Sequence, residues 1–472
     1  MSLFLISALK EAVRIHSRSR RTHTWRHCCC MKPILIKHGR LIDPAQGLDE
    51  ISDVLLMNGL VEAIGANLAE PENATIVDAQ GFVVSPGFVD LHCHLRDPGY
   101  QHKETIATGT AAAARGGFTT VCAMPNTTPP ADSQPVIEYV LSAARDSGLA
   151  RVLPIGCITK GSEGKELAEM GSLAEAGVVA FSDDGAPVSN AHIMQQALYY
   201  SSQLGLPIIN HCEDTSLSAN GSMNAGWVAT RLGLNGIPNS AEEVMVARDI
   251  HLAELTGGHV HIAHASTAGT AELVRKAKTK GLKITCEVTP HHLTLTDEAV
   301  LGSDPDGDMF RPLSYGAYDT SAKVSPPLRS NPDRLSMIKA VNDGTVDHIS
   351  TDHAPHGITD KMCSFGEASN GISVLETALG SLMSLVHSGA LSLPLLIEKL
   401  TSSPAKFVGL NIGTLKPGFG ADVTIIDPNS TWVVDPSKFA SKGKNTPLSG
   451  KSLKGSVVTT IYQGNIVYKA SS

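Results

Sequence analysis

The two ends of the chain share one pattern of hydrophobic and polar positions. In residues 32–87, apolar and polar side chains alternate in short runs that Gly, Asp and Asn separate. The segment after residue 405 has the same texture, notably in "GFGADVTIIDPNSTWVV" and "GSVVTTIYQGNIVYK". Alternation with turn residues at this spacing is typical of strands in small sheets. We therefore predict one composite β-sandwich domain, built from residues 32–87 and 405–472.

The central segment, residues 88–404, follows a different pattern. Short apolar runs alternate there with helix-like stretches such as "KETIATGTAAAARG", which predicts a parallel sheet. Eight runs qualify as strands, the number that a (β/α)8 TIM-type barrel of the α/β class requires: "GFVDLHCHL", "GFTTVCAMP", "RVLPIGCIT", "AGVVAFSDD", "GLPIINHCED", "HVHIAHAS", "LKITCEVTP" and "VDHISTDHAP". A doubly wound open sheet is the alternative, but we find no G-x-G-x-x-G loop that opens a helix.

Residues 1–31 stand apart from both patterns as an N-terminal extension. The first thirty hold one lysine and five arginines against the single acid Glu11, a composition that resembles an organelle transit peptide. The alternative, which we prefer, is that translation begins at Met31, directly before the strand-like "PILIKHGRLI". We expect a cytoplasmic protein, with organelle targeting only if the extension belongs to it.

Composition narrows the class of protein. Of the 472 residues, 42% are hydrophobic and 18% charged, as in ordinary globular proteins. The formal net charge is −8, without a basic stripe beyond the first thirty residues, so we expect no nucleic-acid partner. No apolar run approaches the roughly 18 residues of a membrane span. The nine cysteines are an odd number without regular spacing, which favours a reducing compartment and buried, unpaired thiols.

Side chains that bind metals lie at the carboxyl ends of the predicted strands. His92 and His94 close the first strand, and their spacing of two places both on one face. Others close the fourth, fifth, sixth and eighth strands: Asp183, Asp184, His211, His264 and Asp352. Closure of a barrel brings these ends together around one axis. Imidazoles and carboxylates that converge on one point predict a divalent metal site, and zinc suits this mixture.

The number of these ligands predicts two metal ions. Four histidines and two acids exceed the three protein ligands of one catalytic zinc, and they suit two ions about 3.5–4 Å apart with a shared hydroxide. The pair needs a bridging anion, and no lysine that could be carbamylated lies between Lys165 and the end of the fourth strand. Asp183 or Asp184 must then bridge. We favour Asp184, nearer the loop, and expect Asp183 to form a hydrogen bond with neighbouring backbone.

Seven motifs in order carry a family resemblance: "DLHCHLRDPG", "AMPNTTP", "AFSDDG", "NHCED", "HASTAGT", "CEVTPHHLTL" and "STDHAPH". From about residue 32 to the C-terminus, the chain resembles the type I dihydroorotases of the amidohydrolase superfamily. The resemblance implies a (β/α)8 barrel flanked by a composite β domain. It also implies a metal-dependent hydrolase of cyclic amides, which reversibly cyclises N-carbamoyl-L-aspartate to dihydroorotate in pyrimidine biosynthesis.

The resemblance implies a role for each metal-binding residue. It assigns six ligands to two Zn²⁺ ions: His92, His94 and Asp352 to one ion, His211 and His264 to the other, and Asp184 as the bridge beside the hydroxide. It also makes Asp352 the catalytic residue, which moves a proton between the hydroxide and the amide nitrogen.

The resemblance further implies how the substrate is bound. Arg96, Asn126 and His356 match the positions that bind the substrate carboxylate, and a guanidinium suits that group because it can donate two parallel hydrogen bonds. The backbone of Gly371 is expected to contact the ring. Ser325 departs from the family pattern "K-x-N-P-P-L-R", since this chain reads "KVSPPLR", and a serine reaches less far toward the ring edge. As partners we expect this small molecule and a second copy of the chain in a homodimer, while a complex with aspartate transcarbamoylase stays open.

Residues 302–323 form a segment longer than the resemblance implies. Asp304, Asp306 and Asp308 alternate like the start of a calcium loop, but Tyr315 occupies the twelfth position, where such a loop needs glutamate. We interpret the segment as a surface insertion or a lid. Elsewhere, His291 and His292 follow a strand end, and we expect them to pack beside the metal site.

Two other functions compete with this interpretation. The first is another cyclic amidohydrolase, an allantoinase or a hydantoinase, but Arg96 and Asn126 would have no carboxylate to bind in a neutral hydantoin. The second is a non-catalytic barrel that serves as a scaffold for aspartate transcarbamoylase. Such a scaffold should have lost metal ligands, and all six are present.

Overall fold

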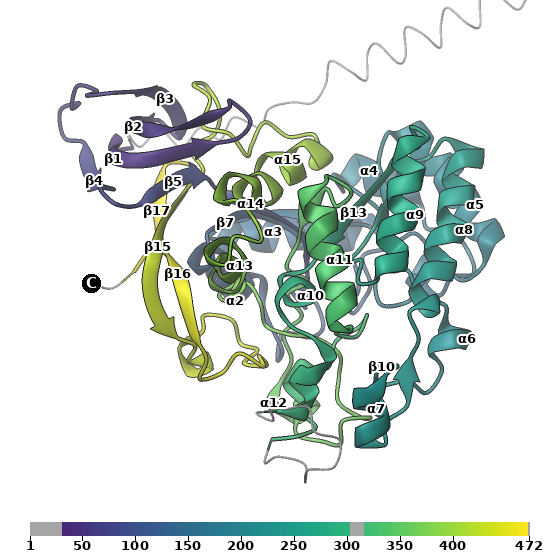
Figure 1. The fold of residues 1–472 in the computed structure, drawn as a ribbon. Coiled ribbons are helices and arrows are strands. Elements are labelled where there is room, and N and C mark those ends of the chain that lie inside the picture. Colours follow the sequence, from purple (N-terminus) through teal and green to yellow (C-terminus); the bar gives the residue numbers. More distant parts are fainter. Residues whose placement is uncertain (1–30, 303–315, 471–472) are drawn as a thin grey trace, which may run out of the picture.

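A closed barrel of parallel strands lies at the centre of the computed structural model, which describes residues 31–302 and 316–470 (Figure 1). Three strands pair in the order β6-β7-β8 and four in the order β14-β13-β12-β9. Their bounds are β6 Phe88–Cys93, β7 Phe118–Ala123, β8 Arg151–Pro154, β9 Ile208–Asn210, β12 Val260–Ile262, β13 Ile284–Val288 and β14 His348–Ile349. Every residue of β6 and β7 is buried, as expected for strands covered on both faces.

Isolated bridges complete the barrel where the two sheets meet. Phe181, in the fourth predicted run, pairs with Gly156 on one side and with Ile208 on the other. Cys93, at the end of β6, pairs with His353 just beyond β14 and closes the ring. All eight runs named from the sequence therefore occupy a strand position in the barrel, and the predicted (β/α)8 fold is confirmed.

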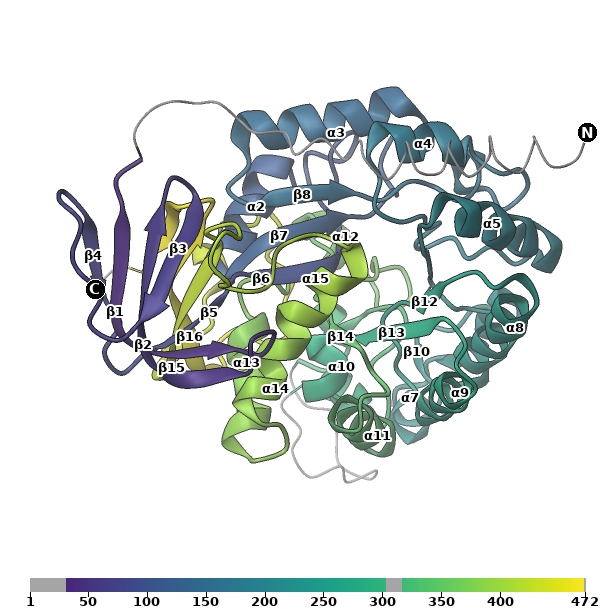
Figure 2. The ribbon, with the colours of Figure 1, turned by 90° about the horizontal axis from the view of Figure 1, so that it is seen from above.

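Helices surround the barrel (Figure 2). In chain order they are α2 Ile106–Arg115, α3 Gln134–Ser147, α4 Met170–Ala176, α5 Ala191–Leu204, α6 Thr215–Ser218, α7 Trp227–Leu232, α8 Ser240–Thr256, α9 Ala268–Thr279, α10 Pro290–Thr294, α11 Asn331–Asn342, α12 Ile358–Lys361, α13 Ala378–His387, α14 Leu393–Leu400 and α15 Ser402–Val408. A small parallel pair, β10 Met223–Asn224 and β11 Gly236–Ile237, lies in the loop after β9.

Local sequence sets the limits of these helices. Thr105 caps α2, because its side chain accepts a hydrogen bond from the backbone N–H of Thr108. Asn190 caps α5 in the same way, through the backbone N–H groups of His192 and Ile193. At the other end of α5, Gly205 adopts φ 70°, a left-handed conformation that ends the helix at little cost only for glycine.

The two ends of the chain build one β domain beside the barrel (Figure 1). Its strands are β1 Ile34–Asp43, β2 Leu48–Met57, β3 Leu60–Gly65, β4 Thr75–Asp78, β5 Val83–Pro86, β15 Val423–Val433, β16 Ser452–Tyr462 and β17 Asn465–Lys469. They follow one hydrogen-bonded path, β17-β16-β15-β5-β1-β2-β3, with β4 beside β1. The antiparallel pair β5–β15 joins the N-terminal and C-terminal segments, whose apolar side chains share one core, as the sequence pattern predicted.

Several predictions from the sequence concern residues that the structure does not describe. The extension 1–30 and the acidic positions of the insertion, Asp304, Asp306 and Asp308, lie outside the described residues. The domain limits also stay predictions, and the limit after residue 404 falls within α15. Five of the six cysteines in the described part are buried, Cys363 is exposed, and all six are free thiols. None of the described helices is long and apolar enough to cross a membrane.

Candidate functional site

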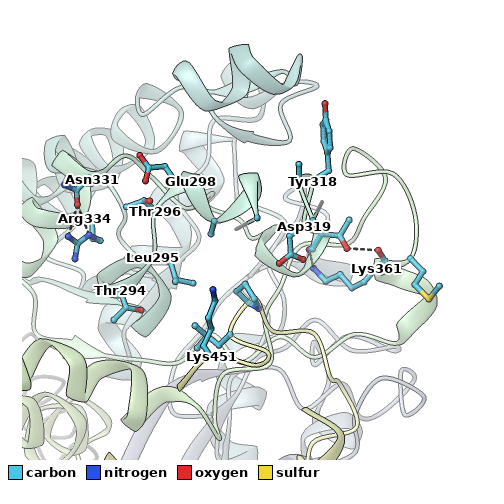
Figure 3. A pocket seen from close by; sticks show the side chains of 18 of the residues that line it. Thr294, Leu295, Thr296, Glu298, Tyr318, Asp319, Asn331, Arg334, Lys361 and Lys451 are labelled. Carbon is cyan, nitrogen blue, oxygen red and sulfur yellow. Dashed lines mark hydrogen bonds between the residues drawn. The ribbon is translucent and has the colours of Figure 1, made fainter. Parts of the chain in front are cut away.

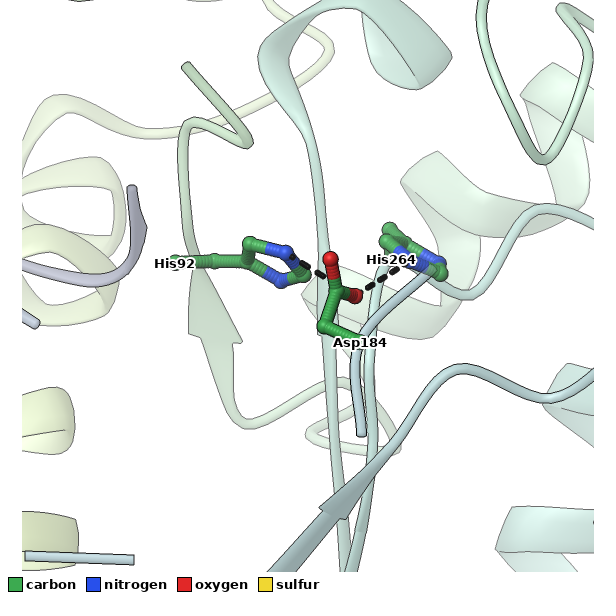
Figure 4. A group of neighbouring side chains, drawn as sticks. All are labelled: His92, Asp184 and His264. Carbon is green, nitrogen blue, oxygen red and sulfur yellow. Dashed lines mark ion pairs between the residues drawn. The ribbon is translucent and has the colours of Figure 1, made fainter. Parts of the chain in front are cut away.

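The six predicted metal ligands lie together at the carboxyl end of the barrel. His92, Asp184 and His264 each direct one ligand atom toward a common point, with these atoms within 4.8 Å of one another (Figure 4). His92, His94 and Asp352 form a second such group. His211 joins the first group, because its Nδ1 lies 2.8 Å from His264 Nε2 and 3.7 Å from Asp184 Oδ1.

The residues of this cluster fit a metal ion. His92 Nε2 and Asp184 Oδ1 lie 3.3 Å apart, and both are buried without a hydrogen-bond partner among the described residues. A buried polar atom without a partner costs roughly 1–3 kcal/mol, so two of them facing each other require an explanation. A divalent cation between imidazole nitrogen and carboxylate oxygen would satisfy both atoms.

The surrounding histidines favour the ionised form of the carboxylates in the cluster, which is the form that binds a metal. Burial by itself would raise the pKa of Asp184, but His92, His264 and His94 outweigh it and lower the pKa well below its usual range. Burial also opposes ionisation of Asp352, but the charge of His92 and the hydrogen bond and charge of His94 lower its pKa.

Three of the predicted site residues have a strained backbone conformation. Arg96, His264 and Asp352 adopt φ of 60°, 33° and 46°, in the left-handed region that residues with a Cβ rarely occupy. Strain of this kind persists only where the surrounding structure imposes it, and it clusters at functional sites. All three residues were selected from the sequence as site residues on other grounds.

Glu287, which we did not predict, contacts two histidines beneath the metal ligands. It lies in β13 and is fully buried, with Oε1 2.8 Å from His92 Nδ1 and Oε2 3.2 Å from His261 Nε2. Burial opposes its ionisation, but its contacts with His261 and His92 lower the pKa of Glu287 well below its usual range. Because a carboxylate only accepts hydrogen bonds, His92 Nδ1 carries a proton toward Glu287, which leaves Nε2 as the nitrogen that can bind a metal. An acid inside the apolar run "ITCEV" was the signal in the sequence.

The change Glu287→Gln should weaken metal binding by about 10–100-fold, because it removes the negative charge that orients His92 and makes it more basic. Competition with a chelator measures this affinity directly. The matched control is Glu376→Gln, a mostly buried carboxyl whose partners are Arg115 and backbone N–H groups at Ala440 and Ser441, where the affinity should stay unchanged. Equal metal affinity in Glu287→Gln and the native protein would contradict this role.

A cavity of about 400 Å³ opens above the ligands. Five of the six metal ligands line it. The five predicted substrate-binding residues line it as well: Arg96, Asn126, Ser325, His356 and Gly371. Gly371 adopts φ 141°, and a Cβ at this position would lie 2.6 Å from the carbonyl oxygen of Ala354, so only glycine fits.

Hydrogen bonds tie the polar residues of the cavity to the metal ligands. Asn126 Oδ1 accepts from His94 Nδ1 at 2.9 Å, and Ser325 Oγ donates to Glu213 Oε2 at 3.3 Å. Glu213 also contacts His211 Nε2 at 3.0 Å, and this contact is the main cause that lowers the pKa of Glu213 to about 2. Glu213 was missed from the sequence, although it lies only two positions after His211.

Asp183 has the surroundings expected for the acid that does not bridge. Its Oδ1 accepts hydrogen bonds from the backbone N–H groups of Ile158 and Thr159, and its Oδ2 accepts one from the Thr159 hydroxyl. These contacts turn the carboxylate away from the histidines, whereas Asp184 lies between them. The choice of Asp184 as the bridge agrees with this geometry.

The two neighbouring histidines after β13 are both buried. His292 is held by the Thr289 hydroxyl and the Pro326 carbonyl oxygen, whereas the ring nitrogens of His291 have no hydrogen-bond partner among the described residues. Burial is the main cause that lowers the pKa of each ring. Both therefore stay neutral beside the site.

A larger cavity, of about 1360 Å³, is lined by residues of the barrel and by Lys451 from the C-terminal segment (Figure 3). Thr294, Glu298, Arg334 and Lys451 are among the residues that line it. It borders Gly302 and Gly316, where the described chain is interrupted. None of the predicted ligands or substrate-binding residues contributes to its walls, so size does not identify the functional cavity here.

Comparison with known proteins decides the family. The family model "Dihydro-orotase-like" matches residues 81–270. A dihydroorotase from Geobacter metallireducens is 49% identical over 436 residues, which cover 92% of this chain and 99% of the relative. A dihydroorotase from Pelotomaculum thermopropionicum is 51% identical over 435 residues, with 92% and 98% covered. The chain belongs to the dihydroorotase family.

Solved structures of related enzymes support the architecture of this dihydroorotase family member. An L-hydantoinase (dihydropyrimidinase) from Arthrobacter aurescens superposes with a TM-score of 0.81 at 26% identity, covering 94% of this chain and 97% of that one. A dihydropyrimidinase from Brevibacillus agri gives 0.78 at 22% identity, with 93% and 95% covered. The second likeness concerns the fold alone. Sequence identity to the named dihydroorotases is about twice as high.

Proposed function

We propose that the chain catalyses the reversible, zinc-dependent cyclisation of N-carbamoyl-L-aspartate to dihydroorotate. One observation carries the proposal: Arg96, Asn126 and His356 line the same 400 Å³ cavity as the metal ligands. A carboxylate clamp next to a metal centre suits a cyclic amide that carries a carboxylate. Membership of the dihydroorotase family supports this choice of substrate.

Two zinc ions are the cofactor that we infer from the donor set. His92, His94 and Asp352 would hold one ion, His211 and His264 the other, and Asp184 would bridge them, beside a shared hydroxide. The two groups of ligand atoms share His92, so the two positions lie next to each other. When bound, such a pair supplies an activated water and polarises the scissile carbonyl.

The chain's own residues then position the substrate and move the proton. Arg96 donates two hydrogen bonds to the ring carboxylate, with Asn126 and His356 beside it. Asp352, which is buried and ionised, accepts the proton of the attacking water and delivers it to the leaving amide nitrogen. The backbone of Gly371 contacts the ring, and Ser325 is held near the ring edge through Glu213.

The alternative functions explain less of the cavity. A hydantoinase or allantoinase shares the metal centre, but the arginine that faces the ligands would have no partner on a neutral ring. A non-catalytic scaffold would not need six converging ligands. A homodimer, a complex with aspartate transcarbamoylase and a cytoplasmic location remain predictions from the sequence.

Arg96→Ala tests the proposed specificity. It should weaken the kcat/KM for dihydroorotate by roughly 10–100-fold, because a charge-assisted hydrogen bond contributes about 1.5–3 kcal/mol. A neutral hydantoin has no carboxylate to lose, so its turnover should change little. Steady-state kinetics on both compounds measure the difference. Equal losses for the two would mean that Arg96 is structural and that the proposed recognition of the carboxylate is wrong.

A further inference from the structure

A lysine that the proposed mechanism does not use lies beside the substrate cavity, in contact with His356. Lys103 lies in the loop between β6 and α2, with its side chain 16% exposed. It lines a second cavity of about 530 Å³, which shares Arg96 and Asn126 with the substrate cavity. Its Nζ lies 3.3 Å from His356 Nδ1 and 3.4 Å from Asp360 Oδ2.

These contacts determine which nitrogen of His356 carries a proton. The ammonium of Lys103 can only donate, so His356 Nδ1 accepts its hydrogen bond and is unprotonated. On the other side of the ring, Nε2 lies 2.8 Å from the carbonyl oxygen of Asn370, which can only accept. His356 is therefore the neutral Nε2–H tautomer, and Arg96 Nη2, 3.3 Å from Nε2, cannot donate to it.

The charges around the ring agree with this assignment. The groups that act on it are the cations Arg96, Lys103 and Lys361 and the carboxylate of Asp360. Burial first, and then Arg96 and Lys103, lower the pKa of His356 to about 3, so the ring stays neutral.

If Lys103 were absent, Asp360 would favour a proton on His356 Nδ1, in competition with the Asn370 carbonyl that favours one on Nε2. Its Oδ2 lies 3.7 Å from His356 Nδ1, and a carboxylate favours a protonated nitrogen facing it. Lys103 contacts both groups, and its positive charge offsets the negative charge of Asp360. In the opposite tautomer, the Nε2 lone pair would face the substrate carboxylate, and two acceptors would repel each other.

We propose that Lys103 is a positioning residue, which holds His356 as the Nε2–H tautomer for recognition of the substrate carboxylate. In the free enzyme this N–H is donated to the carbonyl of Asn370, and a carboxylate is the stronger acceptor that replaces or shares it. The inference rests on the proposed function, because it concerns the same carboxylate. It adds a residue that acts through His356 and does not itself contact the substrate.

A double-mutant cycle tests the inference, with kcat and KM for dihydroorotate measured on native protein, Lys103→Met, Asp360→Asn and the double variant. Lys103→Met should raise KM by roughly 10–100-fold with little change in kcat, because one hydrogen bond to a charged group is lost. Lys103→Arg, which still donates, should retain most of the affinity. Adding Asp360→Asn to Lys103→Met should restore most of it, because the charge that favours a proton on Nδ1 is then gone and the Asn370 carbonyl still favours a proton on Nε2.

Two outcomes would overturn the inference. An unchanged KM in Lys103→Met would show that His356 does not depend on it. A double variant as impaired as Lys103→Met would mean that Lys103 binds the substrate directly. Equal metal content in all variants shows that each is folded.

The tautomer itself is measured by NMR on protein labelled with ¹⁵N-histidine, where the His356 ring should show protonated Nε2 in native protein and change in Lys103→Met. This readout needs no substrate. Failure of native protein to use dihydroorotate would therefore reject the proposed function, whereas protonated Nδ1 in native protein would reject the role of Lys103.

Discussion

Asp352→Asn should keep its metal and lose at least roughly 10²-fold, and up to about 10⁴-fold, in kcat. An amide oxygen still coordinates weakly, so the site can stay loaded, but an amide cannot accept the proton of the attacking water. Asp352 is buried, and its Oδ1 lies 3.2 Å from His94 Nε2. Among the described carboxylates, only Asp184 also contacts this nitrogen. Kinetics on protein of known metal content measure the loss.

In Asp352→Asn the kcat/KM of ring opening and that of ring closure must fall by the same factor, because the two directions share one transition state and the equilibrium constant does not depend on the enzyme. A variant that keeps its metal and most of its activity would place the base elsewhere. A variant that loses its metal would show only that Asp352 is a ligand. The two roles are therefore separated by measuring metal and rate on the same sample.

Removal of the metal should abolish activity altogether. The reason is that water at neutral pH is a poor nucleophile until a bound metal lowers its pKa from 15.7 to about 7. A strong chelator should reduce the rate to background, and added Zn²⁺ should restore it, with a plateau at two ions per chain. Activity that survives in rigorously metal-free protein would contradict the proposed metal-dependent mechanism.

Removing His92 and His94 together distinguishes the two positions. One ion would then be left with Asp352 and the bridging Asp184 alone, so a single ion per chain should remain. His211 and His264, with Asp184, still form the other position. Retention of two ions in the double variant would contradict the ligand assignment.

The residues that the sequence predicted best are those fixed by local rules. His92 and His94 are two positions apart at the end of a buried strand, so their shared direction follows from strand geometry. Asp184, His211, His264 and Asp352 end other runs, and closure of the barrel fixes where those ends meet. The fourth run illustrates the limit of such rules, because "AGVVAFSDD" contributes only the isolated bridges of Phe181.

The residues that the sequence did not predict depend on contacts between distant segments. Glu287 is 195 positions from His92, and Lys103 is 253 positions from His356. A glutamate in an apolar run and a lysine before a helix have many ordinary structural roles. Only the packed barrel shows that each of them faces a nitrogen of a site histidine, and therefore which ring nitrogen is free to act.

Turnover of dihydroorotate, hydantoin and allantoin by one preparation of zinc-loaded protein tests the central claim most directly. We predict that dihydroorotate is opened and N-carbamoyl-L-aspartate is closed. The two neutral rings should have a kcat/KM at least roughly tenfold lower, the smallest effect of one charge-assisted hydrogen bond. A protein that uses hydantoin or allantoin as well as or better than dihydroorotate would contradict the account.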